Sequence, residues 1–150
     1  MWAAFWMLGD DVAQVGWPAC GEIDIMENVG KEPEVVHASI HGPGYAGGSA
    51  IETHYNLAAG ERFADSFHLF AIEWDSDSIL FYVDQHLYAK RTRADLPPGG
   101  KWVFDKPFFL VLNLAIGGDW AGVPDSSTVF PKDMLVDYVR VYQRDEAVKK

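Results

Sequence analysis

The sequence has one cysteine, few basic residues and no long apolar run, and each shortage excludes a class of protein. Cys20 has no second cysteine with which to form an internal disulfide, and we expect it to be a small buried apolar residue. No apolar stretch approaches the ~20 residues of a membrane-spanning helix. Twelve basic against 22 acidic residues give a net charge of −10, which argues against nucleic acid and anionic membranes as partners. Residues 1–6 lack the charged start of a signal peptide.

Helical periodicity is also scarce, and short strands separated by Gly, Pro and Asp turns take its place. We expect strands at residues 2–8, 21–28, 34–41, 66–74, 78–83, 86–92, 107–115 and 135–143. Loops are expected at 42–65 and 94–106, with one short helical turn at 131–134. Evenly spaced strands predict an all-β fold, a jelly-roll β-sandwich with a concave sheet face. Because no repeat or linker is visible, residues 1–150 are expected to form a single domain.

Aromatic residues are plentiful, at 14% of the chain with six tryptophans. Core packing accounts for most of the phenylalanines in a domain of this size. Flat tryptophan rings also match the apolar faces of pyranose sugars. Composition alone leaves both uses of the tryptophans open.

The stretch Glu22–Glu27 carries three carboxylates on a segment that otherwise has the apolar residues of a buried strand. Like charges at this spacing repel one another and lose hydration, so a fold retains them for a function. Side chains alternate along a strand, which puts Glu22 and Asp24 on one face and Glu27 on the other. One extra residue at Ile25-Met26, forming a β-bulge, would return Glu27 to their face.

Two glutamates on one face with an aspartate between them fit a retaining glycosidase. In that mechanism an ionised carboxylate attacks the anomeric carbon, and a second carboxyl stays protonated to donate to the leaving oxygen. A third carboxyl between them can orient the nucleophile and separate the two pKa values. Glu22, Asp24 and Glu27 supply all three, but their spacing does not say which glutamate has which role.

Several stretches together resemble glycoside hydrolase family 16, in its laminarinase (endo-1,3-β-glucanase) branch. The matching stretches are Trp2–Leu8, Gly16–Pro18, Gly21–Gly30, Ser39–Tyr45, Phe67–Trp74, Leu112–Gly118 and Val136–Tyr142. The resemblance implies that Glu22 is the nucleophile, Glu27 the acid/base and Asp24 the assisting carboxylate. It also implies the bulged form of the motif, which laminarinase-like members carry and lichenase-like members lack.

The resemblance further implies a set of substrate-binding residues. Trp2 and Trp6, at i and i+4 on one strand, match the family's sugar-stacking tryptophans, although core packing is the alternative for both. Trp17 matches a further tryptophan of the cleft. His41 is either a cleft residue or a structural histidine, on the strand beside the catalytic one.

Two later positions have a similar ambiguity. Asn113 either binds substrate or holds a backbone turn, and Trp120 either borders the cleft or caps a loop. A structural Ca²⁺ is the one metal that the resemblance implies, with Asp137 matching its side-chain ligand; the chemistry itself requires no cofactor. Ca²⁺ takes six to eight oxygen ligands, and the family draws the others from strands before Trp2.

Those earlier strands have no counterpart in this sequence, in which Ala3 also stands where the family usually has proline. We therefore expect a jelly roll that is N-terminally truncated relative to the family domain. Its open sheet edges would favour self-association. The resemblance also implies an extracellular protein with β-glucan as its partner.

The function that these observations predict is endo-acting, retaining hydrolysis of 1,3-β-linked glucan. Activity on mixed-linkage 1,3-1,4-β-glucan is included in this expectation. The alternative is a glucan-binding protein on the same fold with little or no turnover. Agarose or carrageenan is a third possible substrate, which the Gly42–Tyr45 stretch disfavours because it resembles the glucan branch.

Overall fold

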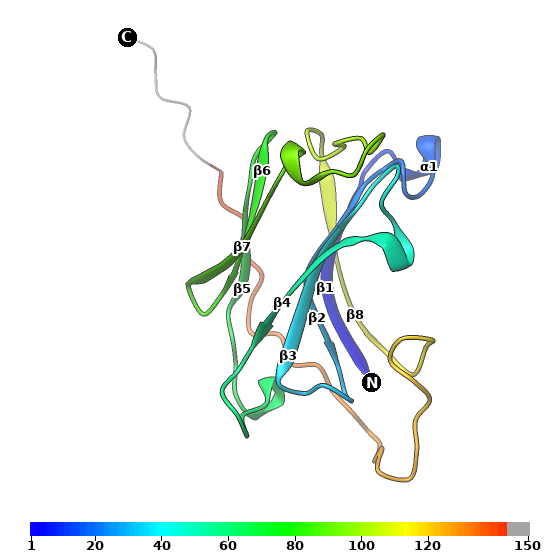
Figure 1. Ribbon diagram of the computed structural model, residues 1–150. Helices are drawn as coiled ribbons and strands as arrows, with labels where there is room; N and C mark the ends of the chain where they lie inside the picture. Colours follow the sequence, from blue (N-terminus) through cyan, green and yellow to red (C-terminus); the bar gives the residue numbers. More distant parts are fainter. Residues whose placement is uncertain (144–150) are drawn as a thin grey trace.

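Alternation of apolar and polar side chains organises the strands into two antiparallel sheets that pack face to face (Figure 1). The computed structural model describes residues 1–143. The larger sheet has the strand order β4-β3-β2-β1-β8. Its strands are β1 (Trp2–Gly9), β2 (Glu22–Val29), β3 (Val35–His41), β4 (Ile51–Asn56) and β8 (Phe108–Ala115). The smaller sheet has the order β5-β6-β7, comprising β5 (Phe70–Trp74), β6 (Ser78–Val83) and β7 (His86–Thr92). The predicted all-β sandwich is confirmed.

Helical structure is confined to short connections, as the weak helical periodicity predicts. The single α-helix of the described residues is α1 (Val12–Val15), which follows β1. Three 3₁₀ turns are η1 (Gly47–Ser49), η2 (Phe63–Asp65) and η3 (Arg93–Asp95). Among the described residues, no helix has the length and apolar character needed to cross a membrane.

The core lies between the two sheets and draws side chains from both. Ile23, Ile25 and Ile40 come from the larger sheet, and Ile79 and Phe81 from the smaller one. Each of these side chains is at most 3% exposed. Burial of each contributes roughly 1.5–3 kcal/mol, so the sandwich is held together mainly by apolar contact between its layers.

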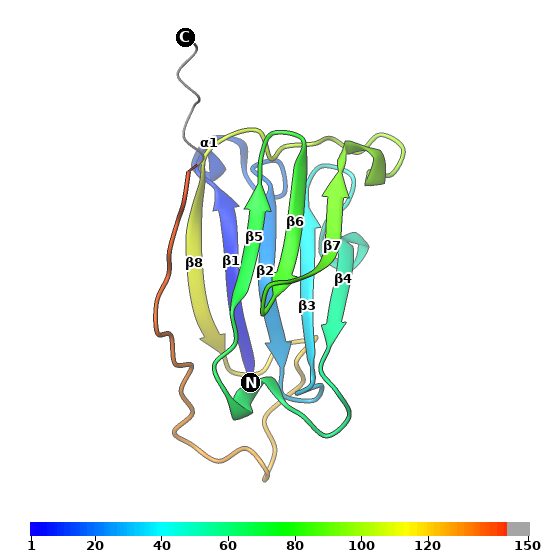
Figure 2. The same ribbon diagram turned by 90° about the vertical axis from the view of Figure 1, so that its left-hand side faces the viewer.

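The smaller sheet does not cover the whole of the larger one. Figure 2 shows β5, β6 and β7 in front of β1–β4, with β8 to one side of them. Leu112 of β8 pairs with Phe5, which packs against the core, yet Leu112 is 41% exposed. The core-side face of β8 is therefore partly open within the described part of the chain.

A β-bulge interrupts β2 at the position that the carboxylate spacing predicts. On the β1 side, Phe5 pairs with Met26 and Trp6 pairs with Asp24, so that Ile25 has no partner of its own. Both Ile25 and Met26 are buried, at 3% and 6% exposure. Two successive side chains thus enter the core, which shifts the alternation of the following residues by one.

Two strand predictions need correction near the middle of the chain. The predicted loop 42–65 contains β4, whose residues alternate between half-buried and exposed. The β-branched Ile51 and Thr53 carried this signal, but the surrounding glycines obscured it. The strand predicted at 66–74 begins only at Phe70, because the backbone N–H of Leu69 bonds the carboxylate of Asp84 instead of a ladder partner.

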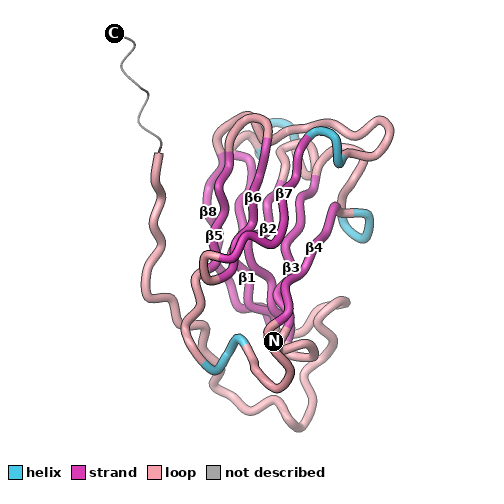
Figure 3. Tube along the Cα trace, turned by 60° about the vertical axis from the view of Figure 1, so that its left-hand side comes forward, coloured by secondary structure: helices cyan, strands magenta, loops and turns pink. Residues whose placement is uncertain are grey.

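Predictions for the C-terminal part were also wrong. Residues 131–134 form no helical turn, and residues 135–143 form no strand although their apolar residues alternate. Figure 3 shows the described residues after β8 as loop. Leu135 and Val141 are 74% and 80% exposed. A strand needs a hydrogen-bonded neighbour, and the described residues provide none here.

We predict that Ile25→Ala lowers the free energy of unfolding by about 2–4 kcal/mol, because it leaves a cavity beneath the bulge. Urea unfolding followed by fluorescence would measure the loss. Val123→Ala is the matched control, since Val123 is 88% exposed and its truncation should cost less than ~0.5 kcal/mol. Equal losses for the two variants would contradict the placement of Ile25 in the core.

Candidate active site

Glu22, Asp24 and Glu27 lie on the face of β2 that points away from the core. The bulge produces this arrangement, because the four residues of β2 from Asp24 to Glu27 lie opposite only three residues of β3, from Ser39 to His37. The intervening Ile25 and Met26 point inward. The prediction that all three carboxylates share one face is confirmed.

Asp24 is the most buried of the three carboxylates, at 3% exposure. Its Oδ2 atom accepts a hydrogen bond from the Ser39 hydroxyl and lies 3.0 Å from Nε2 of His41. The same Nε2 atom is 3.8 Å from Oε1 of Glu22. Asp24 is thus a buried carboxylate whose charge is balanced by hydrogen bonds from β3.

The ring of His41 is oriented from both sides. The backbone N–H of Gly47, in η1, donates to Nδ1 at 3.1 Å, so Nδ1 accepts and Nε2 carries the proton toward Asp24. Burial would lower the pKa of His41, but the hydrogen bond and charge of Asp24 raise it overall. In the neutral ring, the Gly47 N–H holds Nδ1 as the acceptor, which leaves the proton on Nε2.

Two tryptophans donate to the two glutamates. The indole Nε1–H of Trp17 donates to Oε2 of Glu22 at 2.7 Å. The indole Nε1–H of Trp2 donates to Oε1 of Glu27 at 3.0 Å. Trp6, between them on the same face, donates to Oδ1 of Asn113 at 2.8 Å. The structure therefore brings Trp2, Trp6, Trp17 and Asn113 together at the carboxylate face.

The loop that carries Trp17 is held against the end of β1. Gly9 pairs with Gly21 across this loop, and a Cβ at Gly9 would collide with the Cys20 carbonyl. Lys106 bridges to Asp11 at 2.7 Å. Cys20 itself is fully buried, as expected. These contacts fix the base of the loop, while Trp17 at its tip is 49% exposed.

Trp120 reaches the same face from the loop after β8. Its ring lies edge-on to Trp2, with centroids 5.1 Å apart and an interplanar angle of 87°. It also meets His37 edge-on at 4.9 Å. Trp120 therefore borders the carboxylate face beside the Trp2–Glu27 hydrogen bond.

The sequence interpretation missed two residues of this face, Ser39 and His37. His37 pairs with Glu27 across the ladder, and its ring nitrogens contact Glu52 at 2.7 Å and Glu32 at 3.0 Å. The signal was present in the alternation of residues 37, 39 and 41, which puts their side chains on one face of the strand. Recognising it required the register between β2 and β3.

The two glutamates share an environment that favours protonation. Burial and then the negative charge of Asp24 raise the pKa of Glu22 to about 7. The same two causes raise the pKa of Glu27 to about 8. The hydrogen bonds from Trp17 and Trp2 and the nearby His41 act in the opposite direction. Near neutral pH, the raised pKa values of both glutamates allow one of the pair to be protonated while the other is ionised.

Three potential metal ligands lie close together in this arrangement. Glu22, Asp24 and His41 offer atoms within 4.8 Å of one another, and hydrogen bonds from Trp17, Ser39 and Gly47 hold these three side chains. Asp137 is exposed and belongs to no group of three potential ligands among the described residues.

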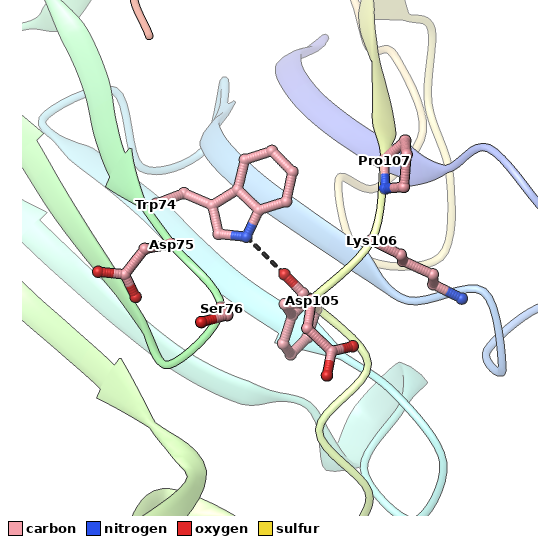
Figure 4. Close-up of a pocket in the computed structure, with 7 residues that line it drawn as sticks. Trp74, Asp75, Ser76, Asp105, Lys106 and Pro107 are labelled. Carbon is pink, nitrogen blue, oxygen red and sulfur yellow. Dashed lines mark hydrogen bonds between the residues drawn. The ribbon is translucent and has the colours of Figure 1, made fainter. Parts of the chain in front are cut away.

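A pocket of about 390 Å³ lies elsewhere, between the end of β5 and the residues before β8 (Figure 4). Trp74 crosses it and donates its indole N–H to the Phe104 carbonyl at 2.7 Å. None of the predicted site residues lines this pocket. The candidate active site is the open carboxylate face of the larger sheet.

Comparison with known proteins agrees with this geometry. The family model described as glycosyl hydrolases family 16 matches residues 1–140. A beta-glucanase of Rhodothermus marinus is 39% identical over 95% of this chain and 52% of its own length. A glucan endo-1,3-beta-glucosidase A1 of Niallia circulans is 37% identical over 95% of this chain and 22% of its own length.

Among solved structures, an endo-beta-1,3-glucanase from Pyrococcus furiosus superposes with a TM-score of 0.83 at 51% identity. That match covers 87% of this chain and 50% of the other. The chain thus spans about half the length of the beta-glucanase and the solved glucanase that it matches.

We predict that Glu27→Gln makes the protein more stable than wild type at pH 9, with a smaller difference at pH 5. The folded-state pKa of Glu27, about 8, lies above the ordinary glutamate pKa of 4.5. Its contribution to stability is therefore full below pH 4.5 and is lost as pH rises through 8. Glutamine cannot ionise and does not incur this loss.

Urea unfolding at both pH values would measure this difference. Glu61→Gln, at an exposed position, is the matched control and should change the free energy of unfolding by less than ~0.5 kcal/mol. A Glu27→Gln effect that is independent of pH would contradict the buried, protonated state of Glu27.

Proposed function

The chain belongs to glycosyl hydrolase family 16, and on this premise we propose that it cleaves 1,3-β-linked glucan as an endo-acting, retaining hydrolase. The observation that carries the proposal is the bulge in β2, which gathers Glu22, Asp24 and Glu27 on one face. Retaining chemistry needs two carboxyls near each other on one face, and the charge of Glu22 acts on Glu27. The similarity to proteins named endo-1,3-beta-glucanase supports the choice of linkage.

The first step forms a glycosyl-enzyme ester. The ionised carboxylate of Glu22 attacks the anomeric carbon as the bond from that carbon to the leaving oxygen breaks. Glu27 donates its proton to the leaving oxygen, which departs as a hydroxyl. The pKa of about 8 keeps Glu27 protonated at neutral pH, and the pKa of about 7 leaves a substantial fraction of Glu22 ionised.

The second step reverses these roles. The Glu27 carboxylate takes a proton from water, which attacks the anomeric carbon. The bond to Glu22 breaks, and the electron pair returns to its carboxylate. Two displacements at the same carbon retain the configuration of the sugar.

Asp24 assists without reacting. It lies between the two glutamates in sequence, and its charge raises the pKa of both. The hydrogen bonds from Ser39 and His41 fix its position. As positive charge develops on the sugar ring, the negative charge of Asp24 becomes favourable in the transition state.

The tryptophans of the face suit the apolar surfaces of glucose rings. We assign sugar contacts to Trp2, Trp6 and Trp17, with Trp120 extending the aromatic border beside Trp2. The hydrogen bond from Trp6 to Asn113 fixes the Trp6 ring from β8. By analogy with aromatic pairs, each ring contributes about 1 kcal/mol beyond area burial.

Three further assignments belong to this proposal. The substrate is a β-glucan polysaccharide, an extracellular location suits such a polymer, and Asp137 would supply one of the oxygen ligands of a structural Ca²⁺. The proposal also includes self-association through the edge strands β4, β5, β7 and β8.

We predict that the protein releases reducing ends from laminarin with overall retention, and that Glu22→Gln abolishes this activity. Glu27→Gln should lower the rate by ~10²–10⁴-fold, because general acid catalysis is lost. Product analysis by chromatography and proton NMR would follow both. Binding of laminarin without products would instead support a glucan-binding protein, and full activity of Glu22→Gln would refute the nucleophile assignment.

We also predict a bell-shaped pH dependence of kcat/KM with limbs near pH 7 and pH 8. Activity rises as Glu22 loses its proton around its pKa of about 7, and falls as Glu27 loses its proton around its pKa of about 8. Initial rates on laminarin between pH 5 and 10 at constant ionic strength would test this. An activity optimum below pH 6 would contradict it.

A further inference from the structure

Two indole N–H groups each donate a hydrogen bond to a different catalytic glutamate. Trp17 meets Oε2 of Glu22 at 2.7 Å, and Trp2 meets Oε1 of Glu27 at 3.0 Å. Sugar stacking uses the faces of these rings, whereas the N–H group projects from the ring edge. The contact with carboxylate is therefore separate from any contact with substrate.

We propose that Trp17 and Trp2 are positioning residues, each of which holds one oxygen of a catalytic glutamate through its indole N–H. This inference rests on the proposed hydrolase function and extends it to the atoms that react. Trp17 occupies Oε2 of Glu22 and leaves Oε1 to attack the anomeric carbon. Trp2 occupies Oε1 of Glu27 and leaves Oε2 to carry the proton.

The chemistry of the donor decides the direction of the effect. An indole N–H donates and cannot accept, so it stabilises whichever carboxyl oxygen carries negative charge. In the glycosyl-enzyme, the sugar is bonded to Oε1 of Glu22, and Oε2 becomes the ester carbonyl that still accepts from Trp17. When Glu27 gives up its proton from Oε2, the new charge is shared with the Oε1 atom held by Trp2.

The other groups around each glutamate differ in kind. Glu22 faces Asp24 on its own strand and His41 on β3, with Leu8 opposite on β1. The charges of Asp24 and His41 also act on Glu27.

The ladder partners of Glu27 are His37 on β3 and Ala4 on β1. Glu32 and Glu52 contact the two ring nitrogens of His37. Leu8 and Ala4 are uncharged and donate no side-chain hydrogen bond. The donors to the two glutamates from β1 and from the loop after it are therefore the indoles of Trp2 and Trp17.

Trp6 provides an internal control on the same face. It shares the strand and the orientation of Trp2, but its N–H donates to Asn113 and not to a catalytic glutamate. Replacing Trp6 by phenylalanine removes an N–H from this face and leaves the indole hydrogen bonds of Glu22 and Glu27 in place. A general loss of cleft shape would affect all three variants, whereas the positioning role distinguishes them.

The first test compares the pH profiles of Trp17→Phe, Trp2→Phe and Trp6→Phe. Loss of the Trp17 donor should move the acid limb of kcat/KM upward by about one pH unit, and loss of the Trp2 donor should move the basic limb upward by a similar amount. We expect Trp2→Phe also to lower kcat by about tenfold. Trp6→Phe should raise KM and leave both limbs in place.

A second measurement separates the N–H from the ring and from turnover. Replacing Trp17 or Trp2 by 3-benzothienylalanine keeps the bicyclic ring but substitutes sulfur for the N–H. Carboxyl ¹³C NMR titration of the ligand-free protein, assigned with Glu22→Gln and Glu27→Gln, would report each glutamate directly. The titration midpoint of Glu22 should rise in the Trp17 replacement, and that of Glu27 in the Trp2 replacement.

Unchanged midpoints in both benzothienyl proteins would overturn the inference, as would equal shifts in Trp6→Phe. Absence of laminarin hydrolysis by the wild-type protein would refute the proposed function alone, because the NMR titration needs no substrate. The failure of one proposal is therefore distinguishable from the failure of the other.

Discussion

The β-bulge in β2 is the constraint on which the rest of the site depends. It sends Ile25 and Met26 together into the core and brings Glu27 to the face of Glu22 and Asp24. Core packing and the geometry of the carboxylate face therefore have one cause. Without the extra residue, strict alternation would point Glu27 into the core and Met26 toward the solvent.

The raised pKa values of the two glutamates have a cost in folding stability. Burial beside Asp24 holds the two glutamates at pKa values of about 7 and 8, where proton transfer at neutral pH is possible. The same burial disfavours their charged forms and costs stability as pH rises. Hydrogen bonds from Ser39, and from the tryptophans that face the glutamates, compensate in part and determine where each charge resides.

Strands that show alternation and also have neighbours were predictable, as β2 and β6 illustrate. The segment 135–143 has the alternation but, among the described residues, no partner, and it is not a strand. In contrast, β4 pairs fully with β3 although its glycine-rich surroundings indicated a loop. Propensity is a local property, whereas a strand depends on the hydrogen-bonding edge of another segment.

The sequence by itself determined the three carboxylates, the need for a bulge and the tryptophans beside it, because residue type and a period of two are local information. Only the tertiary structure decided that Trp17 and Trp2 donate to different glutamates, that Ser39 and His41 hold Asp24, and that Trp120 borders Trp2. These contacts join residues from different strands and loops. Their distances follow from strand register and loop packing, which no short stretch of sequence specifies.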